Sequence, residues 1–447
     1  MSSELVKTLE GIVGAEHVLA DGEARRYAVD GVIPAVAVFP GSVEEVSEIL
    51  RACSRAKAAV VPWGAGCYMG MGGVPERVEI VLGLGRLVRI IEHEPGDMTS
   101  TVQAGLVLRD FQAALGRQGQ FLALNPPMAD RATIGGILAA NASGPRRLRY
   151  GTARDLLIGI RVVHADGTVT KGGAKVVKNV TGYDMNKLYV GSLGTLGVIV
   201  EATFRLHPTP AMERTWVASF STASRAHEAV VSILASPLVP SALELLSGSA
   251  AAEVGRGSAV LPDSKGPLLA VAVASIPEAV EAQLHSVRET VAKAGGGDGE
   301  ILDGEVQRRF WAAVTNYDAG KGAVVLKASV LLSKVALAVD LGERLAARYG
   351  LLVAAISEAG TGVVRYYLRA EGGGTDRTAR LAESVKAVRA FATEAKGSLV
   401  VLEAPVEVKA AVDVWGPVGK GLGLMQALKA EFDPDRILNP GRFAGGL

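Results

Sequence analysis

Three glycine-rich stretches, each beside a run of apolar residues, constrain the fold of this chain more than any other feature. They lie at residues 62–73 (PWGAGCYMGMGG), 129–169 and 177–206. Glycine permits positive φ angles and lets backbone N–H groups approach a ligand closely. In the first stretch, N–H groups that point inward would form an anion nest suited to a pyrophosphate. A flexible turn explains that one stretch equally well, so the inference depends on all three occurring together.

The glycine spacing disfavours two common kinds of nucleotide-binding site. Residues 62–73 do not follow G-x-G-x-x-G, no G-K-[ST] follows them, and the next residues do not predict a helix. A Rossmann NAD site and a nucleoside triphosphatase are therefore disfavoured. The small residues at 134–144 indicate close backbone approach to a bulky ligand. Hydrophobic alternation in LLIGIRVVHADGTV predicts a β-hairpin that turns at Asp166 and Gly167.

The order of predicted elements indicates an α+β chain with separate domains. Residues 36–61 predict a strand, a helix with Ser42 as its N-cap, and a second strand. Many short strands interrupted by single helices favour an α+β domain over a regular doubly wound sheet. The segment 207–214 carries two prolines and predicts a linker. We expect domains at 1–210 and 211–410, and a C-terminal segment at 411–447.

Composition narrows the class of protein. The 447 residues carry a net charge of +1, which gives no global field to attract nucleic acid or an anionic membrane. The only cysteines, Cys53 and Cys67, cannot build an iron–sulfur cluster or zinc site alone. No apolar run is long enough to span a bilayer, and the N-terminus predicts an amphipathic helix rather than a secretory signal. We expect a cytoplasmic protein, with peripheral attachment to the inner membrane through partners as the alternative.

The motifs together resemble one flavoprotein family. PWGAGC, TIGGILAANASG, RYG and GSLGTLG occur in order, and the tail ends in DPDRILNPGRF. This combination is similar to the vanillyl-alcohol oxidase and p-cresol methylhydroxylase (PCMH-type) family, in its branch of FAD-linked 2-hydroxyacid dehydrogenases. The resemblance implies a two-part PCMH-type FAD-binding domain, an α+β (ferredoxin-like) cap domain and a helical C-terminal segment that returns to the FAD domain.

The resemblance also implies which residues bind FAD. They belong to the pyrophosphate cradle, the segment that lines the flavin and its diphosphate, the next turn, a segment near the adenine, and the returning tail. The predicted cofactor-binding residues are Pro62, Trp63, Gly64, Ala65, Gly66, Cys67, Tyr68, Pro127, Thr133, Gly135, Gly136, Asn141, Gly144, Tyr150, Gly151, Asp155, Gly194, Val198 and Asn439. The resemblance assigns no catalytic residue, so the catalytic residues are unknown from the sequence.

Two departures from the family pattern change the expected chemistry. Related D-lactate and D-2-hydroxyglutarate dehydrogenases carry a His-rich metal motif in the cap, but no histidine follows His285 here. The corresponding stretch, 357–373, is SEAGTGVVRYYLRAEGG, so we expect no metal site. Members with covalent flavin often place a histidine where this chain has Cys67. We therefore expect noncovalent FAD, with Cys67 as a small residue packed against the diphosphate.

In both departures, the chain resembles the smaller flavin subunits (E subunits) of bacterial glycolate oxidases. The run KNVTGYD and Leu193, at a position where others have glutamate, support this. The resemblance implies a flavin subunit of a glycolate or lactate dehydrogenase complex, with a second flavin subunit and an iron–sulfur subunit as partners and a small 2-hydroxyacid as substrate. Two alternatives are a non-catalytic electron-transfer or structural subunit and a self-sufficient, metal-free dehydrogenase.

For several charged and aromatic residues, the sequence allows both a functional and a structural role. Arg365 and Tyr367 share one face of a predicted cap strand, where an arginine would suit a substrate carboxylate. An ordinary exposed strand face is the favoured interpretation. The basic run at 145–151 (PRRLRYG) contacts either an anion or only solvent. Tyr183 and Asp184 are expected in a loop near the flavin, with a structural role favoured. For His93 and His164, structural roles are favoured over catalysis.

Overall fold

The computed structural model divides the chain into two compact units. Unit 1 comprises residues 1–143, 151–209 and 417–447, and unit 2 comprises residues 144–150 and 210–416. The structure describes the chain except residues 1–2, 175–182, 261–265, 319 and 372–374. Among the described residues, no helix is both long and apolar enough to cross a membrane.

Among the described residues, unit 1 contains two larger sheets and a two-stranded one, β11-β7. The first has the order β1-β2-β4-β3, in which β2, β4 and β3 run parallel and β1 pairs antiparallel with β2. The second is antiparallel, with the order β5-β6-β10-β8-β9. The strands are β1 Val18–Ala20, β2 Val36–Val38, β3 Val60–Trp63, β4 Ile80–Gly83, β5 Ile90–Glu94, β6 Thr99–Gln103, β8 Leu157–Val163, β9 Val169–Gly173 and β10 Val198–Arg205.

Local sequence signals account for several elements of unit 1. Helix α3 (Val43–Ala56) begins where the Ser42 side chain accepts a hydrogen bond from the Glu45 N–H, so the predicted N-cap is confirmed. Its apolar stripe packs inward, and helix α1 (Ser3–Val13) lies beside it. The predicted hairpin is also confirmed, because β8 and β9 pair antiparallel around the turn at residues 164–168.

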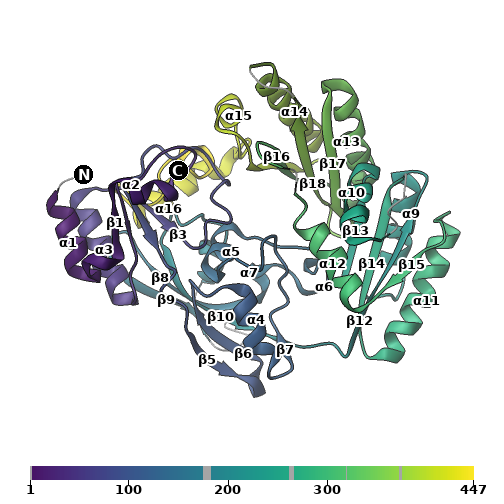
Figure 1. Cartoon of the computed structure of the whole chain (residues 1–447), viewed down its shortest axis with the longest axis horizontal. Coiled ribbons are helices and arrows are strands. Elements are labelled where there is room, and N and C mark those ends of the chain that lie inside the picture. Colours follow the sequence, from purple (N-terminus) through teal and green to yellow (C-terminus); the bar gives the residue numbers. More distant parts are fainter. Residues whose placement is uncertain (1–2, 175–182, 261–265, 319, 372–374) are drawn as a thin grey trace. The chain divides into compact units, whose positions relative to one another are not determined.

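Further helices of unit 1 connect and cover these sheets. They are η1 Ala15–His17, α2 Asp21–Ala24, η2 Arg25–Tyr27, η3 Pro95–Asp97, α4 Leu108–Gly116, α5 Ile134–Ala140, α7 Ala153–Leu156, α8 Asn186–Tyr189, η5 Gly419–Gly421, α16 Leu422–Phe432 and η6 Ala444–Gly446. The C-terminal segment returns to the first sheet, because the Val60 N–H donates to the Ile437 carbonyl at 2.7 Å and the Asn439 N–H donates to the Val60 carbonyl at 2.9 Å. The tail therefore lies beside β3, as the yellow segment in Figure 1 shows.

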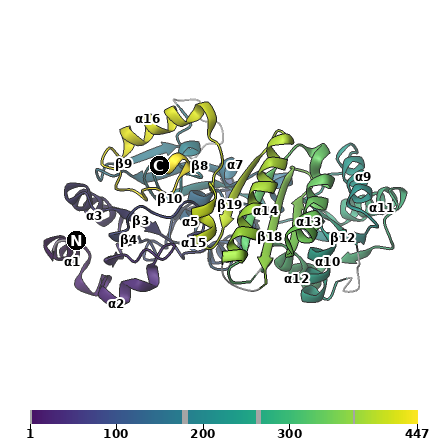
Figure 2. The same ribbon diagram turned by 90° about the horizontal axis from the view of Figure 1, so that it is seen from above.

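Unit 2 is built on one antiparallel sheet with the order β15-β12-β14-β13-β17-β18-β16-β19. Figure 2 shows its helices beside the sheet. The strands are β12 Met212–Ser219, β13 Ala242–Leu246, β14 Leu268–Ser275, β15 Glu300–Leu302, β16 Val324–Ser329, β17 Leu351–Glu358, β18 Val363–Ala370 and β19 Ser398–Glu403. The helices are α6 Arg147–Tyr150, α9 Ala223–Leu234, α10 Gly248–Ser258, α11 Pro277–Lys293, α12 Gly304–Thr315, η4 Leu332–Lys334, α13 Val335–Tyr349, α14 Thr375–Glu394 and α15 Val406–Ala411.

The unit-2 sheet has a buried core on each side. One core, which includes Leu243, Val271 and Tyr366, lies under α9, α11, α13 and α14. A second, smaller core on the other side includes Leu246, Phe310 and Tyr367, and α10 and α12 contribute to it. Apolar residues on both faces of a strand exclude an exposed sheet face.

The α+β class predicted from the sequence is confirmed by this architecture. The expected linker at 207–214 is wrong in part, because it contains strand β11 (His207–Pro208) and the start of β12. β11 pairs with β7 (Gln120–Phe121), which holds this segment in a two-stranded ribbon. The prolines remain compatible with this role because β11 is only two residues long.

Candidate functional site

A loop that follows β3 forms the floor of a pocket in unit 1. Two of its glycines stand where no side chain fits: a Cβ on Gly64 would lie 2.1 Å from Thr133 Oγ1, and one on Gly66 would lie 2.7 Å from the Trp63 ring. Gly66 also has a φ of +76°, in the region that favours glycine. The predicted glycine loop is thus shaped by close approach to its neighbours.

The pocket has about 500 Å³ of empty space, part of it open to solvent. Unit 1 supplies all of its lining, from the loop, helix α5 and the C-terminal return. The lining residues are Pro62, Gly64, Ala65, Gly66, Cys67, Tyr68, Met69, Thr133, Gly136, Ala139, Ala140, Leu193, Asn439 and Arg442. Segments far apart in the sequence therefore build one site.

Helix α5 forms the second wall because its first turn is held close to the loop and the sheet. The Thr133 side chain caps the helix by accepting a hydrogen bond from the Gly136 N–H at 3.3 Å. Gly135 packs against Ala104, whose Cβ would lie 2.9 Å from a Cβ at this position. Tyr68 donates its hydroxyl to the Pro127 carbonyl at 2.7 Å, which fixes the end of the loop.

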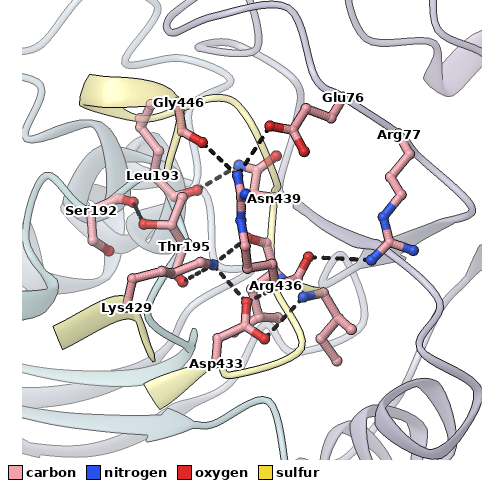
Figure 3. A network of polar contacts seen from close by, with 12 residues as sticks. Glu76, Arg77, Ser192, Leu193, Thr195, Lys429, Asp433, Arg436, Asn439 and Gly446 are labelled. Carbon is pink, nitrogen blue, oxygen red and sulfur yellow. Dashed lines mark hydrogen bonds and ion pairs between the residues drawn. The ribbon is translucent and has the colours of Figure 1, made fainter. Parts of the chain in front are cut away.

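The C-terminal return is held by a buried ion pair, shown in Figure 3. Lys429 Nζ lies 2.6 Å from Asp433 Oδ2 and donates to the carbonyls of Thr195 at 2.8 Å and Leu438 at 2.9 Å. Asp433 in turn accepts from the N–H groups of Ile437 and Leu438. This network fixes the turn that precedes Asn439.

Asn439 carries the return into the pocket lining. Its side-chain nitrogen donates to the Leu193 carbonyl at 2.6 Å, which joins the tail to the third glycine-rich stretch (Figure 3). Its Oδ1 is buried and accepts no hydrogen bond from the part of the chain that the structure describes. A buried acceptor at a pocket wall requires a donor from a ligand or water.

Arg442 places a positive charge in the pocket lining. It is 2% exposed and donates to the carbonyls of Met69, at 2.6 Å, and Met71. Burial lowers its pKa to about 10, although Asp30 acts in the opposite direction, so it stays charged at neutral pH. Because its guanidinium holds two loop carbonyls, it fixes the conformation of the loop that lines the site.

The lining residues fit a dinucleotide. Small side chains and bare backbone at Gly64, Gly66 and Gly136 admit a bulky ligand, and Arg442 places a positive charge near the loop. A diphosphate is favoured by such backbone N–H groups and by a cation. The thiol of Cys67 lines the pocket, and burial raises its pKa, so it stays protonated at neutral pH. A protonated thiol is a poor nucleophile.

The remaining predicted residues lie outside the pocket lining. Trp63 packs edge-on against Tyr27, with 5.4 Å between ring centroids. Asn141 ends α5 in a left-handed conformation, Asp155 caps α7 through Thr152, and Gly151 packs against Asp155. Gly194 lies against Pro62, and Val198 begins β10.

Two predicted residues, Gly144 and Tyr150, belong to unit 2. The pocket lining also contains residues that were not predicted to bind the cofactor: Met69, Ala139, Ala140, Leu193 and Arg442. Arg442 belongs to the tail motif DPDRILNPGRF and follows Asn439 closely, so the resemblance offered a signal for it.

The structure decides between the two interpretations given for Arg365 and Tyr367 and for the basic run at 145–151. Arg365 and Tyr367 are buried, so the favoured exposed strand face is wrong. In the basic run, Arg146 pairs with Glu213 at 3.0 Å and Arg147 with Glu358 at 3.4 Å, which excludes a run that contacts only solvent. Much of KNVTGYD lies outside the described residues, and Tyr183 is 94% exposed.

The histidines with two interpretations have local partners. His164 Nε2 lies 2.7 Å from Thr170 Oγ1, and its ring stacks on Phe432. His93 Nε2 lies 2.9 Å from Gln120 Oε1. Within the described ranges, no three His, Cys, Asp or Glu side chains form a group suited to a metal ion.

Two protein families and several known proteins are similar to this chain. Residues 34–173 match the family described as FAD binding domain, and residues 209–400 and 415–443 match the one described as FAD linked oxidases, C-terminal domain. The chain is 29% identical over 418 residues to "Glycolate oxidase subunit GlcD" of Bacillus subtilis (strain 168), covering 92% of this chain and 89% of that protein.

One further relative matches about half of the chain, and one solved structure matches nearly all of it. "D-lactate dehydrogenase [cytochrome], mitochondrial" of Arabidopsis thaliana is 35% identical over 214 residues, which is 48% of this chain and 37% of that protein. The solved structure of p-cresol methylhydroxylase with substrate bound has a TM-score of 0.77 at 19% identity, covering 98% of this chain and 96% of that one. At this identity the likeness shows the fold.

Proposed function

The chain belongs to the family of FAD-linked oxidases, and we propose that it is a flavin subunit of a 2-hydroxyacid dehydrogenase acting on glycolate or lactate. The pocket of unit 1 carries this proposal, since its glycine loop, helix α5 and C-terminal return provide the small residues and the cation that FAD requires. FAD supplies a hydride acceptor when bound. The similarity to a GlcD subunit and to a D-lactate dehydrogenase supports the substrate class.

The residues that hold FAD in this proposal are those of the pocket lining. Gly64 and Gly66 give the diphosphate access to the loop backbone, and Arg442 fixes that loop and adds positive charge. The buried Oδ1 of Asn439 accepts a hydrogen bond from the cofactor or from a water beside it. The other predicted cofactor-binding residues stay predictions.

Noncovalent binding is part of the proposal. The protonated thiol of Cys67 favours a packing role over attachment to the flavin. Acid precipitation of the holoprotein separates the two cases. We expect the yellow colour to remain in the supernatant, and a yellow pellet would contradict noncovalent binding.

An anaerobic flavin-reduction assay tests the activity. The FAD-loaded chain is mixed with D-lactate or glycolate, and loss of flavin absorbance is followed with and without the partner chains. Rapid bleaching of the chain alone contradicts the non-catalytic electron-transfer or structural alternative. Bleaching only in the presence of partners contradicts the self-sufficient alternative. A flavin that stays oxidised in both conditions refutes the dehydrogenase proposal.

The proposed assembly includes a second flavin subunit and an iron–sulfur subunit, located in the cytoplasm or peripherally at the inner membrane. The similarity to a protein named as a subunit supports a complex. The particular sub-branch, the smaller flavin subunit, stays a prediction. Purification of the tagged chain from its own cells, followed by iron and sulfide analysis, tests this assembly. A pure, iron-free chain would contradict it, and an adjacent reading frame with two C-x-x-C-x-x-C motifs would support it.

A further inference from the structure

Helix α16, the yellow helix labelled in Figure 2, points a lysine inward and a leucine outward. Among the residues of this helix, Lys429 is the buried one, whereas Leu424 is 68% exposed. A surface helix of a globular protein usually has the opposite arrangement, with its apolar residues against the core and its charges in water. The outer face of α16 is therefore a candidate contact surface.

Contacts within unit 1 determine which face of α16 points outward. Phe432 stacks on His164, with 5.2 Å between the ring centroids. Leu422 packs against the end of the chain, because a Cβ on Gly445 would collide with its side chain. Together with the buried Lys429, these two residues define the inner face, so the opposite face cannot turn toward the core.

The outer face carries one stripe of exposed residues, which we call the outer stripe: Lys420, Leu424, Ala427 and Glu431. They follow one another at intervals of four, three and four positions, which is the spacing of a coiled-coil seam. Lys420 belongs to η5, which runs directly into α16. Residues three and four apart lie on the same side of a helix, so these side chains form a continuous row.

The outer stripe is complementary to a second copy of itself. Consider two copies packed antiparallel about a twofold axis, in the register that places Leu424 against Ala427 of the second copy. The same register places Lys420 against Glu431 of the second copy. A large side chain then meets a small one, and opposite charges meet at both ends. One register therefore satisfies side-chain size and charge together.

The two charges of the outer stripe are available for such a contact. Among the residues that the structure describes, the side chains of Lys420 and Glu431 form no ion pair, and both are exposed. A parallel pairing would place like charges opposite each other at both ends, which is unfavourable. Charges at the rim of an interface contribute little affinity but determine its orientation, so they select the antiparallel pair.

We propose that the outer stripe is the contact surface of a homodimer, in which two copies of α16 pack antiparallel about a twofold axis. Leu424 is the apolar anchor of each copy. Two helices of this length bury less surface than a standard interface, so we expect a weak dimer with a Kd of about 1–100 μM. The inference is separate from the proposed activity, since a chain that oxidises a 2-hydroxyacid as a monomer refutes only the dimer.

Sedimentation velocity of the purified, FAD-loaded full chain tests the association. We expect the average mass to rise from monomer toward dimer between about 1 and 200 μM. A chain that stays monomeric over this range refutes the proposal. If that monomer instead sediments with phosphatidylcholine vesicles, the outer stripe contacts lipid, and the proposal is refuted as well.

Leu424→Glu tests the apolar anchor. Because this side chain is mostly exposed in the single chain, we expect the melting temperature of the monomer to stay unchanged. The dimer loses its anchor in both copies, so its Kd rises about 100-fold or more. Val88→Glu, at another exposed apolar position of unit 1, is the control and leaves the Kd unchanged. Equal Kd values for the two variants would place the contact elsewhere and overturn the proposal.

Charge reversal tests the orientation. Lys420→Glu and Glu431→Lys each place like charges at both ends of the pair, so each single variant raises the Kd about tenfold. A mixture of these two variants restores opposite charges at both ends, and we expect heterodimers with the native Kd. Lys7→Glu, exposed on α1, mixed with Glu431→Lys is the control, because it has the same net charges without the match. Equal association of the two mixtures overturns the antiparallel pairing.

Discussion

Replacement of Lys429 by methionine tests whether the buried ion pair holds the C-terminal return. The Lys429 and Asp433 side chains are 3% and 0% exposed, and their charged atoms lie 2.6 Å apart. Methionine fills nearly the same space but leaves the Asp433 charge buried without its cation. It also removes the donor from the Thr195 and Leu438 carbonyls. Loss of one partner of a buried pair costs about 3–5 kcal/mol, so we expect unit 1 to be destabilised by that amount.

The assay follows FAD release during urea unfolding through the rise in flavin fluorescence, because the return carries Asn439 into the pocket lining. The control is Lys187→Met, which breaks an exposed ion pair with Asp184 at 3.0 Å in the same unit. Exposed pairs contribute about 0–1 kcal/mol, so the control midpoint moves little. Equal shifts for Lys429→Met and Lys187→Met would refute the reasoning. Adding Asp433→Asn to Lys429→Met removes the unpaired charge and recovers part of the loss.

Three further outcomes follow from the geometry. Gly64→Ala places a Cβ 2.1 Å from Thr133 Oγ1 and weakens FAD binding about tenfold or more in a fluorescence titration, whereas Gly85→Ala, with nothing within 4 Å, does not. Arg442→Met releases the Met69 and Met71 carbonyls and weakens FAD binding by about tenfold; an unchanged Kd contradicts its role in shaping the loop. The raised pKa of Glu244 stabilises the fold only while the group is protonated, so this contribution is lost as pH rises through the folded-state value. Glu244→Gln therefore raises the melting temperature relative to the native chain at alkaline pH and not at acidic pH, and parallel pH profiles would contradict this.

The glycine loop could be predicted from sequence because its cause is local. At Gly64 and Gly66 the missing side chain is itself the signal, and the same absence of a Cβ lets Thr133 and Trp63 approach. The Ser42 cap was equally predictable, since a serine before an amphipathic run seldom has another use. Such features depend on residues within one element or one turn.

Burial of the unit-2 strand could not be predicted in the same way. Alternation places Arg365 and Tyr367 on one face of β18, but it does not say what covers that face. Here both faces of the sheet carry cores, and Tyr366 on the opposite face is fully buried as well. The contact between Arg365 and Glu358 depends on the pairing of β17 with β18, and the contact with Arg147 joins residues more than two hundred positions apart. A sequence pattern carries no information on such pairings.

The buried ion pairs at Asp433 and at Glu358 place different demands on their surroundings. Around Lys429 and Asp433, one cation meets one carboxylate, and backbone carbonyl and N–H groups satisfy the remaining hydrogen bonds, so the network is complete and serves to hold a turn. Around Glu358, two guanidinium groups meet one carboxylate, and Glu244, whose pKa burial and Glu358 raise, lies opposite it on the neighbouring strand. The Lys429 pair is therefore completed by groups of its own turn and by Thr195, whereas the Glu358 pair depends on the fold bringing α6, β13, β17 and β18 together.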